Sequence, residues 1–128
     1  MVVDPDDLAL LNGPVVIIED DDLMQSLLLE VFTELGGDCR AFITADDALI
    51  HLLQANQAPT LIVTDYTLPG QLDGRELALM VNQRWPVVPI LLISGYGSEI
   101  AGGLPERIAF LQKPWSVEQL VKLVRQAV

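Results

Sequence analysis

The sequence predicts an α/β fold in which helices cover both faces of a parallel sheet. Short, apolar, β-branched runs such as Val15–Ile18 recur along the chain, which is typical of strands buried on both faces. Helical patterns separate these runs, and this alternation indicates crossover connections between parallel strands. We therefore expect a doubly wound, three-layer sandwich with a five-stranded parallel sheet, built from five β-α repeats.

The expected strands are all short. Three runs give strong signals and two, which contain more polar or small residues, give weaker ones. The strong runs are Val15–Ile18, Leu61–Val63 and Val87–Ile93, and the weaker ones are Cys39–Phe42 and Ile108–Leu111. Runs of this length favour strands, because helices are usually longer.

Four segments, each following an expected strand, have helical periodicity. From Leu23 to Leu35 the apolar residues fall on one face, with Asp22 as the expected N-cap and Gly36-Gly37 as the stop. The other three helices are expected from Thr44 to Ala55, from Asp73 to Trp85 and from Ser116 to Ala127, each capped by its first residue. The helix after Ser98 should be short or frayed, because glycines and a proline follow it closely.

Composition indicates one domain with an acidic surface. The chain has 128 residues, of which 51% are hydrophobic, and its formal net charge is −11. We expect residues 14–128 to form the domain and residues 1–13 to be a leader or the remnant of a linker. The charge opposes binding to nucleic acid and to anionic membranes, and favours divalent cations.

Cysteine usage and the absence of targeting signals predict a cytoplasmic protein. Cys39 is the only cysteine, so an internal disulfide is excluded and a buried structural thiol is expected. The first residues lack the pattern of a signal peptide, and no apolar run approaches the length of a membrane span.

Polar residues with chemical potential follow four of the expected strands. Glu19 and Asp20 follow the first strand, Asp65 follows the third, Ser94 ends the fourth and Lys113 follows the fifth. In a doubly wound sheet, ligands bind outside the carboxyl ends of the strands. The sequence therefore predicts one site that combines carboxylates, a hydroxyl and an ammonium group.

The carboxylates indicate a magnesium site. Three neighbouring carboxylates repel one another unless a cation neutralises them, and Mg²⁺ prefers oxygen ligands. Alternatively, the acidic residues from Asp20 to Asp22 only cap a helix. Asp65 speaks against that alternative, because a turn containing Pro69-Gly70 follows it and needs no cap.

Two further positions point to a phosphoryl group. Ser94 precedes Gly95, in a flexible segment able to present a hydroxyl and a backbone N–H to an anion. Lys113 is one of two lysines, and its place after a strand favours pairing with phosphate. On their own, a Ser-Gly turn is uninformative and a loop lysine is usually solvated.

These segments resemble the receiver domain of bacterial two-component response regulators, a flavodoxin-like (βα)5 fold, over residues 14 to 128. The resemblance lies in the order and placement of four motifs. They are Ile17–Asp21, Thr64–Gly70 with Asp73-Gly74 beyond it, Leu92–Tyr96 and Phe110–Pro114.

The resemblance implies a role for each matching residue. Asp65 would be the phosphoacceptor, and Asp20 and Asp65 would bind Mg²⁺ directly. Glu19 would act chiefly through water, and the carbonyl of Thr67 would complete the coordination. The residues expected to contact the phosphoryl group or to switch with it are Ser94, Gly95, Lys113 and Phe110. The resemblance also predicts a cis peptide bond between Lys113 and Pro114.

The chain departs from the family pattern in two loops. The segment between Asp65 and Asp73 is one residue longer than the commonest spacing, as in receivers attached to hybrid sensor kinases. The segment between Ser94 and Lys113 is shorter than usual. Phe110 has no hydroxyl, so a switch there would rest on packing, and static core is the alternative.

The resemblance implies a signalling switch and not an enzyme. The phosphoryl donor would be a histidine kinase or a histidine phosphotransfer protein, and the chain would be a monomer or weak dimer. His51, the only histidine, does not form a donor motif. Two alternatives stay open: a scaffold independent of phosphorylation, and a Mg²⁺-dependent phosphohydrolase, which would typically carry an acid where Thr67 stands.

Overall fold

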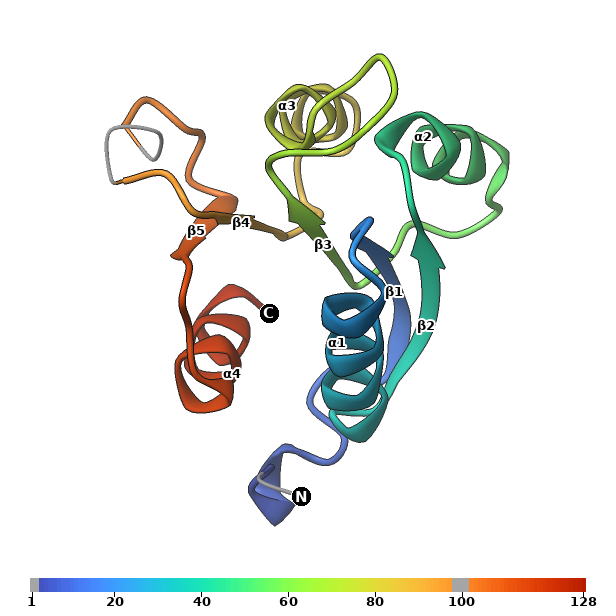
Figure 1. Ribbon diagram of the computed structural model, residues 1–128. Helices are drawn as coiled ribbons and strands as arrows, with labels where there is room; N and C mark the ends of the chain where they lie inside the picture. Colours follow the sequence, from blue (N-terminus) through green and yellow to red (C-terminus); the bar gives the residue numbers. More distant parts are fainter. Residues whose placement is uncertain (1–2, 98–101) are drawn as a thin grey trace.

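The computed structural model describes residues 3–97 and 102–128 as one α/β sandwich (Figure 1). Its five strands are all parallel and lie in the order β2-β1-β3-β4-β5. The strands are β1 (Gly13–Ile18), β2 (Gly37–Phe42), β3 (Leu61–Asp65), β4 (Ile90–Ser94) and β5 (Ile108–Gln112). The α-helices are α1 (Asp22–Glu34), α2 (Ala45–Gln54), α3 (Gly74–Arg84) and α4 (Val117–Ala127), after a short 3-10 turn at Pro5–Asp7. The predicted fold class is confirmed.

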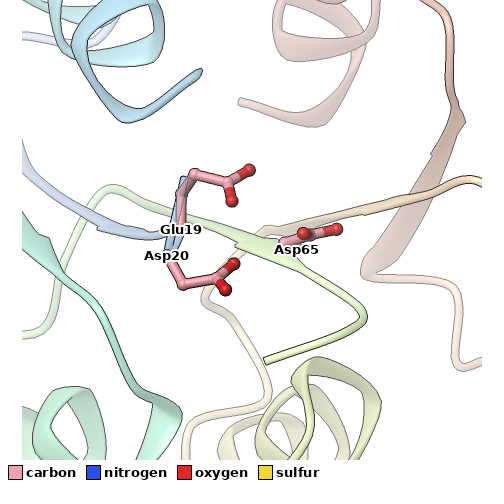
Figure 2. A group of neighbouring side chains, drawn as sticks. All are labelled: Glu19, Asp20 and Asp65. Carbon is pink, nitrogen blue, oxygen red and sulfur yellow. The ribbon is translucent and has the colours of Figure 1, made fainter. Parts of the chain in front are cut away.

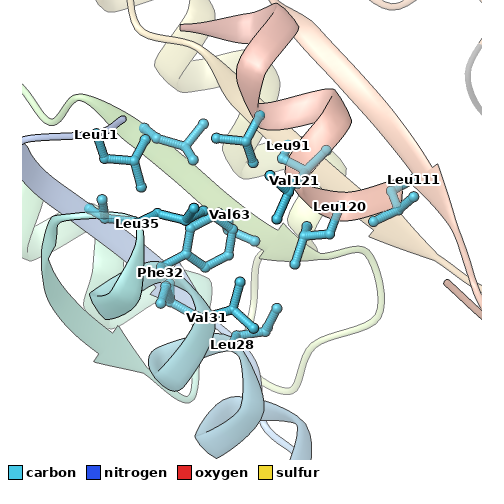
Figure 3. Close-up of a cluster of buried hydrophobic side chains, with 14 of the residues drawn as sticks. Leu11, Leu28, Val31, Phe32, Leu35, Val63, Leu91, Leu111, Leu120 and Val121 are labelled. Atoms are coloured by element: carbon cyan, nitrogen blue, oxygen red, sulfur yellow. The ribbon is translucent and has the colours of Figure 1, made fainter. Parts of the chain in front are cut away.

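Two hydrophobic cores lie on opposite faces of the sheet, because successive residues of a strand point to opposite sides. Val15 and Ile17 of β1 face the core under α1 and α4, which Figure 3 shows around Phe32. Val16 and Ile18 face the core under α2 and α3. All four side chains are almost completely buried, as the unbroken apolar run predicted.

The helix starts follow the predicted capping residues, with one correction. Thr44, Asp73 and Ser116 each accept a hydrogen bond from a backbone N–H in the first turn of the helix that follows. At α1, however, the N-cap is Asp21 and not Asp22, and its side chain accepts from the Met24 N–H. The run of three aspartates hid this position, because each of them is a suitable cap.

Two segments differ from the prediction. The fourth strand begins at Ile90, not at Val87, because Pro86 and Pro89 have no N–H for a ladder and the Val88 N–H turns back to the Trp85 carbonyl. The crossover helix expected after Ser98 falls largely on residues 98–101, which lie outside the described residues. The described parts of that connection, 95–97 and 102–107, contain no helix.

The segment before β1 packs against the body of the domain. Leu11 is 3% exposed and belongs to the core under α1 and α4. Asp7 is also buried, and its carboxylate pairs with the guanidinium of Arg125 in α4. Figure 1 shows this segment on the side of the sheet that α1 and α4 cover. The domain boundary at residue 14 stays a prediction.

Smaller expectations have mixed outcomes. The Lys113-Pro114 peptide is cis, as predicted. Cys39 is half-buried and not fully buried, because it lies in β2 at the edge of the sheet. Burial still raises the pKa of its thiol. Within the described residues, the helices are too short or too polar to cross a membrane.

Candidate functional site

Three carboxylates meet at the carboxyl edge of the sheet. Figure 2 shows Glu19 and Asp20, just beyond β1, extending toward the same space as Asp65 at the end of β3. One carboxylate oxygen from each lies within 4.8 Å of the others. The sheet order explains this arrangement, since β1 pairs directly with β3 and the two strands end side by side. The predicted convergence of these three residues is confirmed.

Glu19 is the most perturbed of the three carboxyl groups. It is 3% exposed, and one of its oxygens accepts the backbone N–H of Asp21 at 3.1 Å. Burial raises its pKa from 4.5 to about 7, and the nearby charge of Asp65 acts in the same direction. At neutral pH the carboxyl group of Glu19 is therefore protonated in part of the metal-free molecules, which lowers the negative charge of the site.

Asp65 is buried but paired. The ammonium of Lys113 lies 3.2 Å from one of its carboxylate oxygens and 3.3 Å from the other. Burial raises the pKa of Asp65, and Lys113 opposes that rise. Lys113 reaches Asp65 because β5 ends beside β4. There the backbone N–H of Lys113 donates a hydrogen bond to the Ser94 carbonyl at 2.7 Å. The predicted meeting of Lys113 and Asp65 is confirmed.

The backbone around Asp65 is fixed by residues that the sequence did not single out as part of the site. The buried hydroxyl of Thr64 donates to the Asp65 carbonyl at 3.0 Å. The Tyr66 N–H lies between the Ile93 carbonyl and a carboxylate oxygen of Asp65, 2.8 and 2.9 Å away. Gly74 approaches so closely that a Cβ there would lie 1.8 Å from the Asp65 carbonyl oxygen. The sequence marked Asp73-Gly74 only as part of the family motif and did not indicate this contact.

The remaining predicted residues surround this centre at different depths. Ser94 is 1% exposed, and its hydroxyl accepts the Tyr96 N–H at 3.0 Å. Gly95 is exposed, and a Cβ there would meet nothing within 4 Å. Thr67 is exposed in the loop after β3. Phe110 is half-buried in β5, opposite Leu92.

Two tyrosines at the mouth of the site escaped the sequence interpretation. Tyr66 follows β3 and Tyr96 follows β4, and their rings pack edge to face with centroids 5.5 Å apart. Tyr96 is 54% exposed, whereas Tyr66 also packs against the core under α2 and α3. The pair joins the loops that carry Thr67 and Gly95. Nothing in the two separate motifs indicated that their aromatic residues touch.

The family comparison agrees with the fold and with this arrangement. A model of the response regulator receiver domain family matches residues 15–125. The chain belongs to this family of signalling domains.

The chain is similar to part of several bacterial regulators. It is similar to the nitrogen assimilation regulatory protein NtrX of Azorhizobium caulinodans, with 32% identity over 88% of the chain. It is also similar to the DNA-binding transcriptional regulator NtrC of Proteus hauseri, with 26% identity over 91% of the chain. In both cases the match covers 25% of the relative, so the chain spans about a quarter of their length.

A solved structure of nearly the same extent shares the fold. The crystal structure of a response regulator receiver protein from Sinorhizobium medicae superposes with a TM-score of 0.79 and 25% identity. The match covers 90% of this chain and 93% of that one.

Proposed function

We propose that this receiver domain accepts a phosphoryl group from a phosphohistidine onto Asp65, in a reaction that requires Mg²⁺, and that phosphorylation changes its contacts with a partner protein. The observation that carries the proposal is the meeting of Glu19, Asp20 and Asp65 with the ammonium of Lys113. This arrangement offers a nucleophile, a cation site and a fixed positive charge within one small volume.

The donor set fits Mg²⁺. Carboxylate oxygens from three residues converge, and Asp20 is exposed, so water can complete the coordination of an octahedral ion. Asp20 and Asp65 would bind the ion directly, Glu19 would act through water, and the Thr67 carbonyl would be the remaining protein ligand. When bound, Mg²⁺ would supply positive charge beside the transferring oxygens.

The transfer itself is a displacement at phosphorus. A carboxylate oxygen of Asp65 forms the new P–O bond, and the P–N bond to the donor imidazole breaks with its electron pair on nitrogen. Lys113 would then pair with a phosphoryl oxygen in place of the carboxylate charge that it contacts now. Such transfers depend mostly on positioning and on neutralising oxygen charge, which are the features that this site offers.

The switch would begin at Ser94. Its hydroxyl now accepts the Tyr96 N–H, and donation of its own proton to a phosphoryl oxygen would pull the loop after β4 toward Asp65. Phe110 lies on the neighbouring strand, so inward rotation of its ring would fill the space that the loop leaves. In this proposal, packing and not a tyrosine hydroxyl would carry the signal from β5.

The proposed donor is a histidine kinase or a histidine phosphotransfer protein acting in trans. The only histidine of the chain, His51, lies in α2 with its ring 5.1 Å from that of Phe42. It is therefore placed against an aromatic neighbour on β2 and outside the carboxylate cluster.

Acetyl phosphate with MgCl₂ tests the proposal without knowledge of the donor. Intact-mass measurement should show the addition of one phosphoryl group to the native chain and none to Asp65→Asn. Asp47→Asn is the matched control, because Asp47 is an exposed aspartate of α2 and should leave labelling intact. Undiminished labelling of Asp65→Asn, or no labelling of the native chain, would refute the assignment.

A further inference from the structure

The loop after the proposed phosphoacceptor is tied to the start of α2, which shares one face of the sheet with α3. Asp46 lies in the first turn of α2, and one oxygen of its carboxylate accepts the backbone N–H groups of Gln71 and Leu72, at 3.2 and 3.3 Å. These contacts span 25 and 26 residues of sequence. The longer loop noted in the sequence thus has a definite anchor.

Gly70 lets the loop come this close to the carboxylate. Its φ of +96° is a conformation that L side chains rarely adopt. A Cβ at this position would also lie 2.7 Å from the same Asp46 oxygen. The same Asp46 oxygen therefore accepts both hydrogen bonds and lies against Gly70, where a side chain would not fit.

The anchored segment includes Thr67, whose carbonyl is the proposed remaining protein ligand of the metal. At its near end the Tyr66 N–H donates to the Asp65 carboxylate, and at its far end Asp46 binds Gln71 and Leu72. Thr67 lies between these two attachments, and its side chain is exposed. The orientation of its carbonyl therefore depends on both ends of the loop.

We propose that Asp46 is a positioning residue for the Mg²⁺ site, which holds the loop from Tyr66 to Leu72 so that the Thr67 carbonyl faces the carboxylate cluster. Asp46 acts through the backbone of the loop and contacts neither the ion nor the phosphoryl group. The inference rests on the proposed function, because it assigns Asp46 to the same site. It also gives the longer loop a role within the domain itself.

The test measures Mg²⁺ affinity by calorimetric titration of the chain with MgCl₂. Losing the bonds that Asp46 accepts should weaken binding about fivefold in Asp46→Ala. Asp46→Asn keeps an acceptor oxygen and should stay within about twofold of the native affinity. Asp47→Ala removes the neighbouring charge, for which no loop contact is present among the described residues, and should match the native chain.

Amide hydrogen exchange provides a second measurement that needs no metal. Exchange at Gln71 and Leu72 should be faster in Asp46→Ala than in the native chain and unchanged in Asp47→Ala. Asp46 is half-buried, so melting temperatures of the variants are needed to identify any general loss of stability.

The outcomes separate this inference from the proposed function. If the native chain neither binds Mg²⁺ nor is labelled by acetyl phosphate, both fail. If the native chain does both, and Asp46→Ala binds Mg²⁺ as Asp47→Ala does, only the role of Asp46 is overturned. Loss of affinity that Asp46→Asn restores supports the role.

Discussion

At the scale of single residues, Asp65 has its backbone held as closely as its side chain. Lys113 contacts the carboxylate, while Thr64 and Gly74 contact the carbonyl of the same residue. The orientation of the carboxylate thus depends on the first residue of α3 as well as on β3. This close approach makes Gly74 far less replaceable than the exposed Gly95 nearby.

We expect Gly74→Ala to lower the free energy of unfolding by about 3 kcal/mol or more, because its methyl group would overlap the Asp65 carbonyl and force the helix away. Gly95→Ala is the control, since a Cβ there has open space, and should change stability by less than about 0.5 kcal/mol. Urea denaturation of the metal-free proteins measures both. Equal effects of the two substitutions would contradict the contact.

The raised pKa of Glu19 makes a prediction about pH. Its pKa rises from 4.5 to about 7 on folding, so the folded metal-free protein holds this proton more tightly than the unfolded chain. The resulting stabilisation is complete below pH 4.5 and is lost as the pH rises through 7. From Glu19 we expect a loss of about 1–3 kcal/mol between those limits.

Urea denaturation in a chelator, at pH values across this range, tests that expectation. Glu19→Gln should flatten the pH dependence, whereas Glu30→Gln, on the exposed side of α1, should retain it. A native slope that survives unchanged in Glu19→Gln would show that another group is responsible.

The sequence predicted the charged centre well and its surroundings poorly, for a physical reason. Glu19, Asp20, Asp65 and Lys113 all lie at strand ends, and the topology of a parallel sheet brings strand ends together. Asp46 carries no such signal, because an acidic residue in the first turn of a helix is ordinary, and its partners are 25 and 26 residues away.

At the scale of elements, the segment before β1 is attached to α4 by an ion pair between the buried Asp7 carboxylate and the half-exposed Arg125 side chain. Asp7 is 5% exposed, and its two oxygens accept hydrogen bonds from the Arg125 guanidinium. Gly36, after α1, lets this segment pack closely, because a Cβ there would lie 2.8 Å from the Leu8 carbonyl oxygen. The two ends of the described chain are therefore fastened to each other.

We expect Arg125→Ala to lower the midpoint of chemical denaturation, because it leaves the Asp7 carboxylate buried without its partner. Lys122→Ala, on the same helix, is the control and should have an effect below about 0.5 kcal/mol. Chemical denaturation of both variants checks this. Indistinguishable unfolding curves would mean that the pair contributes little.

The acidic start of the chain led to the expectation of a leader or linker, and composition could not have indicated the contact. Asp7 and Arg125 are 118 positions apart in the sequence. An aspartate in an acidic segment usually faces solvent. Helix positions, in contrast, followed from local pattern and capping. The single wrong cap, at α1, arose where several adjacent residues satisfied the same local rule.

At the scale of the whole molecule, charge governs which partners are favoured. The chain carries 18 acidic and 7 basic residues. A similar regulator, NtrC of Proteus hauseri, is named as DNA-binding, but the match covers 25% of it. We therefore propose that this domain acts through protein contacts.

The isolated chain should show no measurable affinity for duplex DNA, even at low salt, because its net charge of −11 opposes the phosphate backbone. Fluorescence anisotropy with a labelled duplex measures this, with beryllofluoride and Mg²⁺ added in a parallel series to mimic phosphorylation. Light scattering on the same samples should report a monomer or a weak dimer. Salt-dependent binding would reveal a basic surface that the overall charge conceals.

The carboxylate cluster has a consequence for biosynthesis. Glu19 and Asp20 are translated early, Asp65 near the middle and Lys113 close to the end of the described chain. During translation, the acidic groups are thus made well before the lysine that pairs with Asp65 leaves the ribosome. Because the strand that delivers Lys113 lies at the edge of the sheet, its addition completes the site. If Asp65 is the phosphoacceptor as proposed, a nascent chain that lacks β5 would lack the positive charge beside Asp65 and would be a poor phosphoryl acceptor.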